Sequence, residues 1–254
     1  MKYSLDDILV VIFSCGERTV ELNELCFRKL GFNNIVILDG NDSFVDKYIK
    51  YSKLGIESDY SYFIRNDADR LVFDGLLELV DYGIKNNIDI TGGECFDYLM
   101  NNYRVGTPQF TTRKFIEPLF EDNTLMLNVQ KPESAYIKCL RKNNNIKTDG
   151  FSQLTNLHDF EQYPSKICNT FLNRIFRGDY PRLYNIDYLN KLPNSYKLAL
   201  QTAFDFARSN KEKESMKYID FTFLDDNFES LPRGKELEAI YDLYRQLYNR
   251  LYKK

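Results

Sequence analysis

The sequence has no tryptophan, a single histidine and no C-x-x-C pair. One imidazole argues against HD phosphohydrolases and against zinc enzymes that need several histidines. The five cysteines are odd in number and widely spaced. They indicate reduced thiols in a cytosolic protein and give no sign of zinc or redox chemistry. The aromatic content comes from 19 tyrosines and 19 phenylalanines, rings that pack in a core or stack on a base.

An excess of one charge is also missing, because 34 basic and 37 acidic side chains leave a formal net charge of -3. This balance gives no overall field that would draw in DNA or RNA, so nucleic acid is not expected as a partner. The first apolar run, residues 8–13, is too short for a signal peptide or a membrane span. We therefore expect a cytoplasmic protein without a transmembrane segment.

Strand and helix patterns alternate through the first ninety residues, which predicts an α/β fold with a parallel sheet. Gly31 and Gly55 stand where two of the helices are expected to end. Residues 92–110 read as irregular and polar. The expected strands are 8–13, 35–38, 60–64, 88–90 and 146–148, and the expected helices are 19–30, 44–54, 73–84, 134–142, 165–176, 195–208 and 235–252.

The pattern turns helical beyond Pro164, so we divide the chain into an α/β domain, 1–180, and a helical C-terminal extension, 181–254. The last helix carries apolar residues on one face at a spacing of three and four. Three explanations of that face stay open. It packs onto the body, it forms the seam of a homodimer, or it contacts a membrane surface peripherally.

Polar segments follow the first three expected strands, at 14–18, 39–42 and 67–69. In α/β sheets ligands bind at the carboxyl ends of the strands, where such loops converge. Asp67 and Asp69 would project on one side if extension persists, so both could face one ion. Carboxylate oxygens suit Mg²⁺ or Mn²⁺, which keep open positions for phosphates. The pair therefore predicts a metal site and a nucleotide diphosphate compound as substrate.

With these segments in place, residues 8 to 160 resemble the GT-A fold glycosyltransferases, especially family 2-like enzymes that build bacterial surface polysaccharides such as capsule. The resemblance implies a Rossmann-like, nucleotide-sugar-binding domain. It implies transfer of a sugar from a nucleotide-diphosphate sugar to a glycan or lipid-linked glycan acceptor, in the cytoplasm or peripherally at the inner membrane face. The matching residues are Ser14, Arg18 and Asp39 at the nucleoside side, and Asp67 and Asp69 as the D-x-D that binds Mn²⁺ or Mg²⁺ and the donor diphosphate.

The same family places an acidic residue at the start of a later helix, where it serves as general base in inverting enzymes, and Glu133 is the best match. The pair Glu121-Asp122 competes, because an E-D pair is the more familiar form in that family. A role of Glu133 in stabilising the helix start through the dipole also stays open. The region that approaches the acceptor in this fold contains Asp97, Tyr98, Tyr103, Arg104, Thr107 and Gln109. These side chains suit a sugar and equally suit an ordinary loop anchor.

The resemblance also implies a third metal ligand or a phosphate contact at His158, for which a structural role stays open. Asp159 would orient its imidazole or cap the residues that follow. Arg18, Arg65 and Arg70 are expected to neutralise donor phosphates or to pair with neighbouring carboxylates.

Three other functions compete with sugar transfer. In a HAD-type phosphatase the first Asp of the motif is a nucleophile followed closely by Thr or Val, whereas Arg70-Leu71 follows here. A nucleotidyltransferase opens with a Gly-rich triphosphate loop, but residues 14–18 contain one glycine. The third alternative is a non-catalytic nucleotide- or glycan-binding module. The sequence leaves open the donor sugar, the nucleotide base, the acceptor and the anomeric outcome.

Overall fold

The computed structural model describes residues 3–40, 42–126, 132–143, 146–160, 162–176, 192–209, 219–226, 228 and 233–252. The chain forms two compact units, one of residues 1–96 and 103–157 and one of residues 97–102 and 158–254. The domain boundary predicted near residue 180 lies outside the described residues and stays a prediction. All five cysteines are free.

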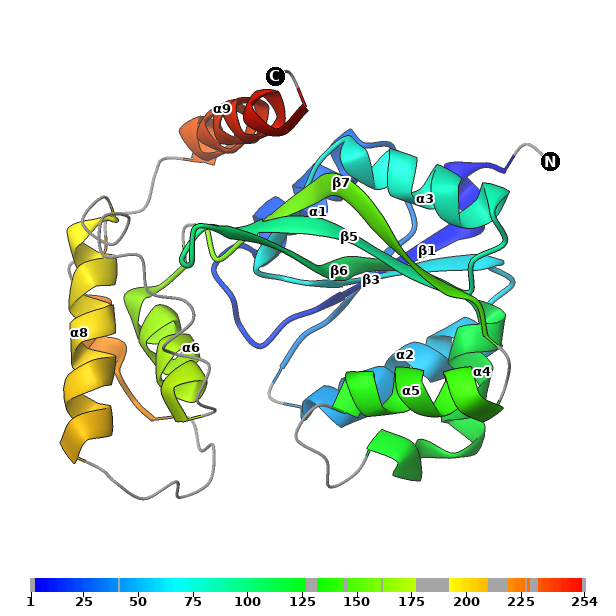
Figure 1. Cartoon of the computed structure of the whole chain (residues 1–254), viewed down its shortest axis with the longest axis horizontal. Helices are drawn as coiled ribbons and strands as arrows, with labels where there is room; N and C mark the ends of the chain where they lie inside the picture. Colours follow the sequence, from blue (N-terminus) through cyan, green and yellow to red (C-terminus); the bar gives the residue numbers. More distant parts are fainter. Residues whose placement is uncertain are drawn as a thin grey trace. The chain divides into compact units, whose positions relative to one another are not determined.

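The first unit is built on a mixed sheet of seven strands in the order β2-β1-β3-β6-β5-β7-β4 (Figure 1). Strand β1 runs parallel to β2 and β3, and β3 pairs antiparallel with β6. The predicted α/β class is therefore confirmed. The strands are β1 (Ile8–Phe13), β2 (Ile35–Leu38), β3 (Tyr62–Asp67), β4 (Arg70–Val72), β5 (Ile90–Asp97), β6 (Asn102–Thr112) and β7 (Thr148–His158).

Helices lie on both faces of this sheet, with α3 on one side and α2, α4 and α5 on the other (Figure 1). All six residues of β1 are buried, as expected for a strand covered on both faces. Its alternate residues Leu9, Val11 and Phe13 join a core with Tyr51 and Phe115. The helical elements are η1 (Leu5–Asp7), α1 (Val20–Lys29), α2 (Phe44–Glu57), α3 (Gly75–Lys85), α4 (Arg113–Glu121), η2 (Asn123–Met126) and α5 (Pro132–Asn143).

The expectation of irregular structure over residues 92–110 is wrong, because this stretch contributes most of β5 and β6. The glycines there allow close packing of strands and do not mark a loop. A Cβ at Gly92 would lie 2.4 Å from the backbone oxygen of Gly106. The expectation that Gly55 ends its helix is also wrong, because α2 continues to Glu57. The glycine instead allows close packing, since a Cβ at position 55 would lie 3.0 Å from Ile116.

The second unit is helical and contains α6 (Pro164–Phe176), α8 (Asn194–Ser209), η4 (Thr222–Leu224) and α9 (Arg233–Tyr252). Helices α6 and α8 lie side by side (Figure 1) and share an apolar core that includes Phe171 and Ala199. In α9 the apolar side chains of Ile240, Tyr244 and Leu247 are buried, at the spacing predicted for its apolar face. None of the helices in the described part of the chain is long and apolar enough to span a bilayer.

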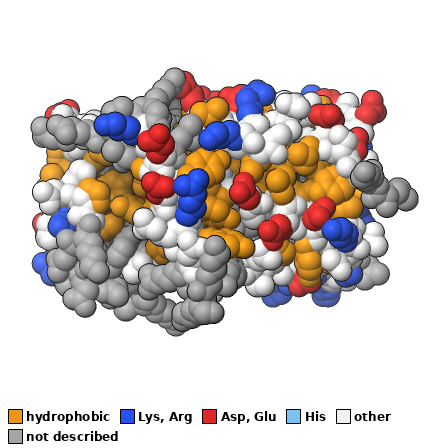
Figure 2. All heavy atoms as spheres, turned by 90° about the horizontal axis from the view of Figure 1, so that it is seen from above, with side chains coloured by type: hydrophobic (Ala, Val, Ile, Leu, Met, Phe, Trp, Pro, Cys, Tyr) orange, Lys and Arg blue, Asp and Glu red, His pale blue; other side chains and the backbone are white. Residues whose placement is uncertain are grey.

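Charged side chains of both signs are interspersed on the face of the molecule that Figure 2 presents. This mixture agrees with the formal net charge of -3.

The close packing at Gly92 gives a test of the β5–β6 pairing. We expect Gly92→Ala to lower the free energy of unfolding by about 1–3 kcal/mol, because the added Cβ meets a backbone oxygen that cannot rotate away. Gly150→Ala in β7 is the control, since no heavy atom lies within 4 Å of its added Cβ. Urea unfolding measures both variants. An equal decrease in the free energy of unfolding of the two variants would show that close strand packing is not the reason for the glycine at position 92.

Candidate functional site

Strands β1, β2 and β3 end side by side, because Phe13 pairs with Leu38 on one side and with Asp67 on the other. The loops that follow therefore start at one edge of the sheet, as predicted. The hydroxyl of Ser14 donates to Asp39 Oδ1 at 2.8 Å and links the loops after β1 and β2. This hydrogen bond and one from the backbone lower the pKa of the exposed Asp39 carboxyl below its usual range.

Asp67 is the last residue of β3, and the chain then turns at Ala68 and Asp69 before β4 begins. The extended conformation that would have placed both carboxylates on one side of a strand is therefore not kept. The turn is fixed by its backbone. The N–H of Ala68 donates to the carbonyl of Phe13 at 2.9 Å, and the Thr19 hydroxyl donates to the carbonyl of Ala68 at 2.8 Å.

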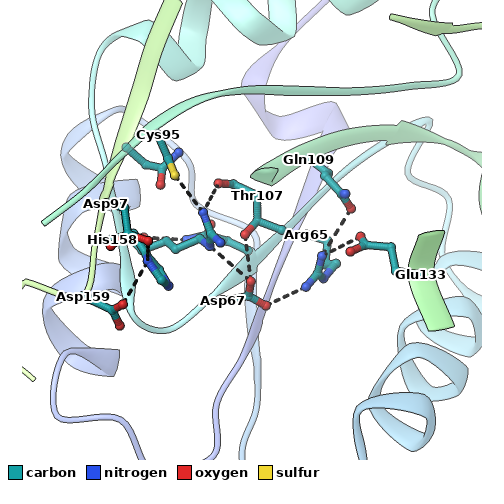
Figure 3. A network of polar contacts seen from close by, with 12 residues as sticks. Arg65, Asp67, Cys95, Asp97, Thr107, Gln109, Glu133, His158 and Asp159 are labelled. Atoms are coloured by element: carbon teal, nitrogen blue, oxygen red, sulfur yellow. Dashed lines mark hydrogen bonds and ion pairs between the residues drawn. The ribbon is translucent and has the colours of Figure 1, made fainter. Parts of the chain in front are cut away.

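The Asp67 carboxylate has two arginine partners, Arg65, which Figure 3 shows beside it, and Arg70. Arg65 Nη2 donates to Oδ1 at 2.6 Å, the Thr107 hydroxyl donates to Oδ2 at 2.7 Å, and Arg70 Nε lies 3.3 Å from Oδ2. Both flanking arginines thus pair with a neighbouring carboxylate, which is one of the two alternatives that the sequence left open. Thr107 comes from β6, so this strand also contributes to the site.

Arg65 joins Asp67 to Glu133 (Figure 3). Its side chain is 2% exposed, and Nη1 donates to Glu133 Oε1 at 2.9 Å. The same carboxylate oxygen accepts a hydrogen bond from the Tyr48 hydroxyl at 2.6 Å. Burial by itself would lower the pKa of Arg65, but the charge of Asp67 and of the other neighbouring acidic groups raises it above the usual value. The guanidinium also lies over three aromatic rings, those of Phe13, Phe44 and Tyr48, at 5.0, 5.3 and 5.1 Å from their centroids.

The structure thus brings Glu133, in the first turn of α5, next to the motif at the end of β3. Gln109 of β6 belongs to the same cluster, since its Oε1 accepts from Arg65 Nη1 at 3.3 Å. The competing pair Glu121-Asp122 lies at the carboxyl end of α4. There the Asp122 carboxylate accepts hydrogen bonds from the N–H and the hydroxyl of Thr124.

Sequence reasoning missed Glu17, an acidic side chain in the loop after β1. Burial, and then the negative charge of Asp69, raise the pKa of the Glu17 carboxyl above its usual range. Its Oε2 accepts the N–H of Cys15 at 2.5 Å. The sequence could have indicated Glu17 as a site residue, because it lies in a loop already assigned to the ligand-binding edge. Arg18, the next residue, is half-buried in the turn before α1.

Lys47 of α2 was missed as well, because a lysine in an amphipathic helix is expected on the solvent side. The structure buries it at 1% exposure, with its amine donating to the carbonyls of Ser14 and Gly40.

His158 belongs to the second unit, where its Nδ1 faces two carboxylates (Figure 3). Nδ1 lies 3.2 Å from Asp97 Oδ2 and 3.1 Å from Asp159 Oδ2. Arg174 Nη2 lies 3.1 Å from the same Asp97 oxygen. Of the two roles left open for Asp159, the structure shows the contact with the imidazole. Asp97 is a second carboxylate that the sequence did not link to His158. All four side chains are buried or nearly so, which gives the second unit an internal charged cluster.

Neither known family models nor curated protein sequences match this chain. Similar solved structures include A197 from STIV, with 13% identity and a TM-score of 0.41 over 61% of this chain and 84% of that one. A glycosyltransferase involved in glycosylation of the major capsid of PBCV-1 has 11% identity and a TM-score of 0.41, over 59% of this chain and 92% of that one. A 2-C-methyl-D-erythritol 4-phosphate cytidylyltransferase from Francisella tularensis has 12% identity and a TM-score of 0.42, over 57% and 90%.

Similarity at this level assigns no reaction to the chain, and the names just given include both a sugar-transferring and a cytidylyl-transferring enzyme.

The raised pKa of Glu17 predicts a pH-dependent effect on stability. A carboxyl whose pKa is higher in the folded than in the unfolded chain stabilises the fold below the unfolded pKa, and this contribution is lost as the pH rises through the folded pKa. Removing the charge with Glu17→Gln should therefore raise the melting temperature at about pH 7.5 and change it little near pH 4.

The control is Glu24→Gln, which removes a surface carboxylate paired with Arg28 at 2.6 Å. It should lower stability at neutral pH by less than ~1 kcal/mol. A melting temperature of Glu17→Gln that falls at neutral pH would contradict the assignment of unfavourable burial to this carboxyl.

Proposed function

We propose that this protein is a metal-dependent glycosyltransferase that moves a sugar from a nucleotide-diphosphate sugar to a glycan or lipid-linked glycan acceptor in polysaccharide biosynthesis. The proposal is supported above all by one arrangement. The Ser14–Asp39 hydrogen bond and the turn at Asp67-Ala68-Asp69 lie at the adjoining carboxyl ends of three parallel strands. We expect the protein to act in the cytoplasm, and at the inner membrane face where the acceptor is lipid-linked.

On the donor side, Asp39 and Ser14 would hold the nucleoside. An exposed carboxylate with a lowered pKa stays ionised at neutral pH and accepts hydrogen bonds from ribose hydroxyls. Arg18 would contact the diphosphate. Arg65 would serve donor binding through Asp67, whose carboxylate it holds by a 2.6 Å hydrogen bond.

The carboxylates of this edge suit a divalent cation. Asp67 has two arginine partners that balance its charge. Burial first, and then the negative charge of Asp69, raise the pKa of Glu17, so Glu17 and Asp69 repel each other. Oxygen donors of this type fit Mn²⁺ or Mg²⁺, and a nitrogen donor such as His158, which the family resemblance suggests as a third ligand, favours Mn²⁺. Such an ion, when bound, would offset charge on the leaving diphosphate.

Glu133 is the proposed general base, which would take the proton of the acceptor hydroxyl as that oxygen attacks the sugar. Its place is fixed by two donors on Oε1, Arg65 at 2.9 Å and Tyr48 at 2.6 Å. Because these hydrogen bonds already orient the carboxylate, no further free energy is needed to orient it when the acceptor reacts.

The reaction products decide between sugar transfer and its alternatives. We expect incubation with nucleotide-diphosphate sugars and Mn²⁺ to release a nucleoside diphosphate, and Asp69→Asn to lower that rate at least ~100-fold. Asp74→Asn is the matched control, because Asp74 is an exposed carboxylate five residues further along the chain.

Formation of pyrophosphate from a nucleoside triphosphate and a sugar phosphate would instead identify a nucleotidyltransferase. A trapped aspartyl-phosphate would identify a phosphatase of the HAD type. Donor binding without turnover for any acceptor would indicate a binding module. Sugar transfer at an unchanged rate in Asp69→Asn would contradict the metal role of that carboxylate.

Two variants separate a base from an anchor at Glu133. Glu133→Gln keeps an acceptor oxygen for Arg65 and Tyr48 but cannot take a proton, so kcat should fall ~100-fold or more with the donor KM little changed. Tyr48→Phe removes the 2.6 Å hydrogen bond to Glu133 and a longer one, 3.4 Å, to Gln109, and should reduce kcat far less because the Glu133 carboxylate can still take a proton. Similar, small losses of activity in both variants would leave Glu133 as an anchor for Arg65.

A further inference from the structure

Lys47 occupies a position where helix α2 would ordinarily place an apolar residue. The buried residues of this helix include Lys47, Tyr51 and Gly55, which are spaced four apart and so form one stripe. The start of the helix is fixed by a capping box between Ser43 and Asp46, so the direction of this stripe is set locally. A lysine in such a stripe brings a charge into the interior, and lysines are almost never fully buried without partners.

The three donors of the Lys47 amine are matched by three acceptors, all in the loops after β1 and β2. Nζ donates to the carbonyl of Ser14, to the carbonyl of Gly40 at 2.9 Å and to Cys15 Sγ at 3.0 Å. The charge of Lys47 also contributes to lowering the pKa of the nearby Asp39 carboxyl. One buried ammonium thereby links a helix to two loops that are also joined to each other by the Ser14–Asp39 hydrogen bond.

Both loops need such a link because their backbones turn sharply. Gly16 and Gly40 have φ values of +78° and +103°, in the left-handed region that glycine alone enters readily. Glycine also raises the number of conformations open to an unrestrained loop. A ligand that bound to unrestrained loops would have to supply the free energy of ordering them, whereas loops that are already ordered leave that free energy for affinity.

We propose that Lys47 is a positioning residue of the nucleotide site: its ammonium holds the loops after β1 and β2 in the conformation that binds the nucleoside diphosphate. This inference rests on the proposed function for the identity of the ligand. The ordering of the loops by Lys47 does not depend on that identity. Lys47 touches no reacting atom, so its removal should affect affinity and not the chemical step.

The test replaces the ammonium and keeps the length of the side chain. Lys47→Met should raise the Kd of nucleoside diphosphates, measured by calorimetry with UDP, GDP, ADP, CDP and dTDP in the presence of Mn²⁺, by ~10-fold or more for whichever nucleotide binds the unaltered protein. The donor KM should rise in parallel, while kcat at saturating donor stays within about threefold. Hydrogen exchange without nucleotide should become faster at the amides of Ser14, Gly16 and Gly40.

The control is Lys53→Met, on the same helix six residues further on. Lys53 is exposed and lies 3.7 Å from Glu57 of the same helix, so its loss should change neither nucleotide affinity nor amide exchange in the two loops. A second variant, Lys47→Gln, keeps a shorter donor that can reach one carbonyl, and should give an intermediate affinity. It also serves if Lys47→Met does not fold.

Folded Lys47 variants with unaltered loop exchange and unaltered nucleotide affinity would overturn the proposal and leave Lys47 as a core residue. A fall in kcat with no change in Kd would also overturn it. If the unaltered protein binds none of the five nucleotides, the proposed function fails, and amide exchange in Lys47→Met still decides whether the lysine orders the loops.

Discussion

The candidate site depends on the burial of one guanidinium. Arg65 is 2% exposed, and a charge taken out of water is tolerated only where ion pairs and hydrogen bonds replace its hydration. Its partners come from different elements: Asp67 ends β3, Glu133 lies in the first turn of α5, and Tyr48 lies in α2. Loss of one partner of a buried pair typically costs about 3–5 kcal/mol, so this cluster fixes the strand end and both helices together. The site is therefore stabilised by the same contacts that shape its candidate catalytic groups.

Charge is divided unevenly along the turn at the end of β3. Arg65 and Arg70 both face Asp67, so that carboxylate is neutralised by groups of the protein itself. Asp69 lies near a second carboxylate, Glu17, whose pKa is raised by burial and then by the negative charge of Asp69. Asp67 thus faces two arginines, and Asp69 has the Glu17 carboxylate among its neighbours. In the proposal both carboxylates bind the cation, and the two arginines in addition hold Asp67 in place.

Side chains from the helices hold the backbone of the ligand-binding edge. Thr19 and Asn23, at the start and in the first turn of α1, donate to backbone carbonyls of the turn at residues 67–69. Lys47 of α2 does the same for the loops after β1 and β2. Loops that carry polar groups at a sheet edge are costly to order when a ligand arrives. Hydrogen bonds from buried helix residues order these loops before a ligand binds, and a site ordered in this way is called preorganised.

The sequence by itself determined the strands 8–13 and 35–38, because a short continuous apolar run between polar loops favours a strand, fully buried in the first case and only partly buried in the second. It also determined that Ser14 and Asp39 share an edge, since parallel strands end together. Only the tertiary structure decided that Gly92 lies in a strand, that Lys47 is buried, and that Arg65 bridges Asp67 and Glu133. Periodicity reports on neighbours in the chain, whereas a buried charge or a close backbone contact is set by partners far away in sequence. Arg65 and Glu133 are 68 residues apart, and no local pattern encodes their meeting.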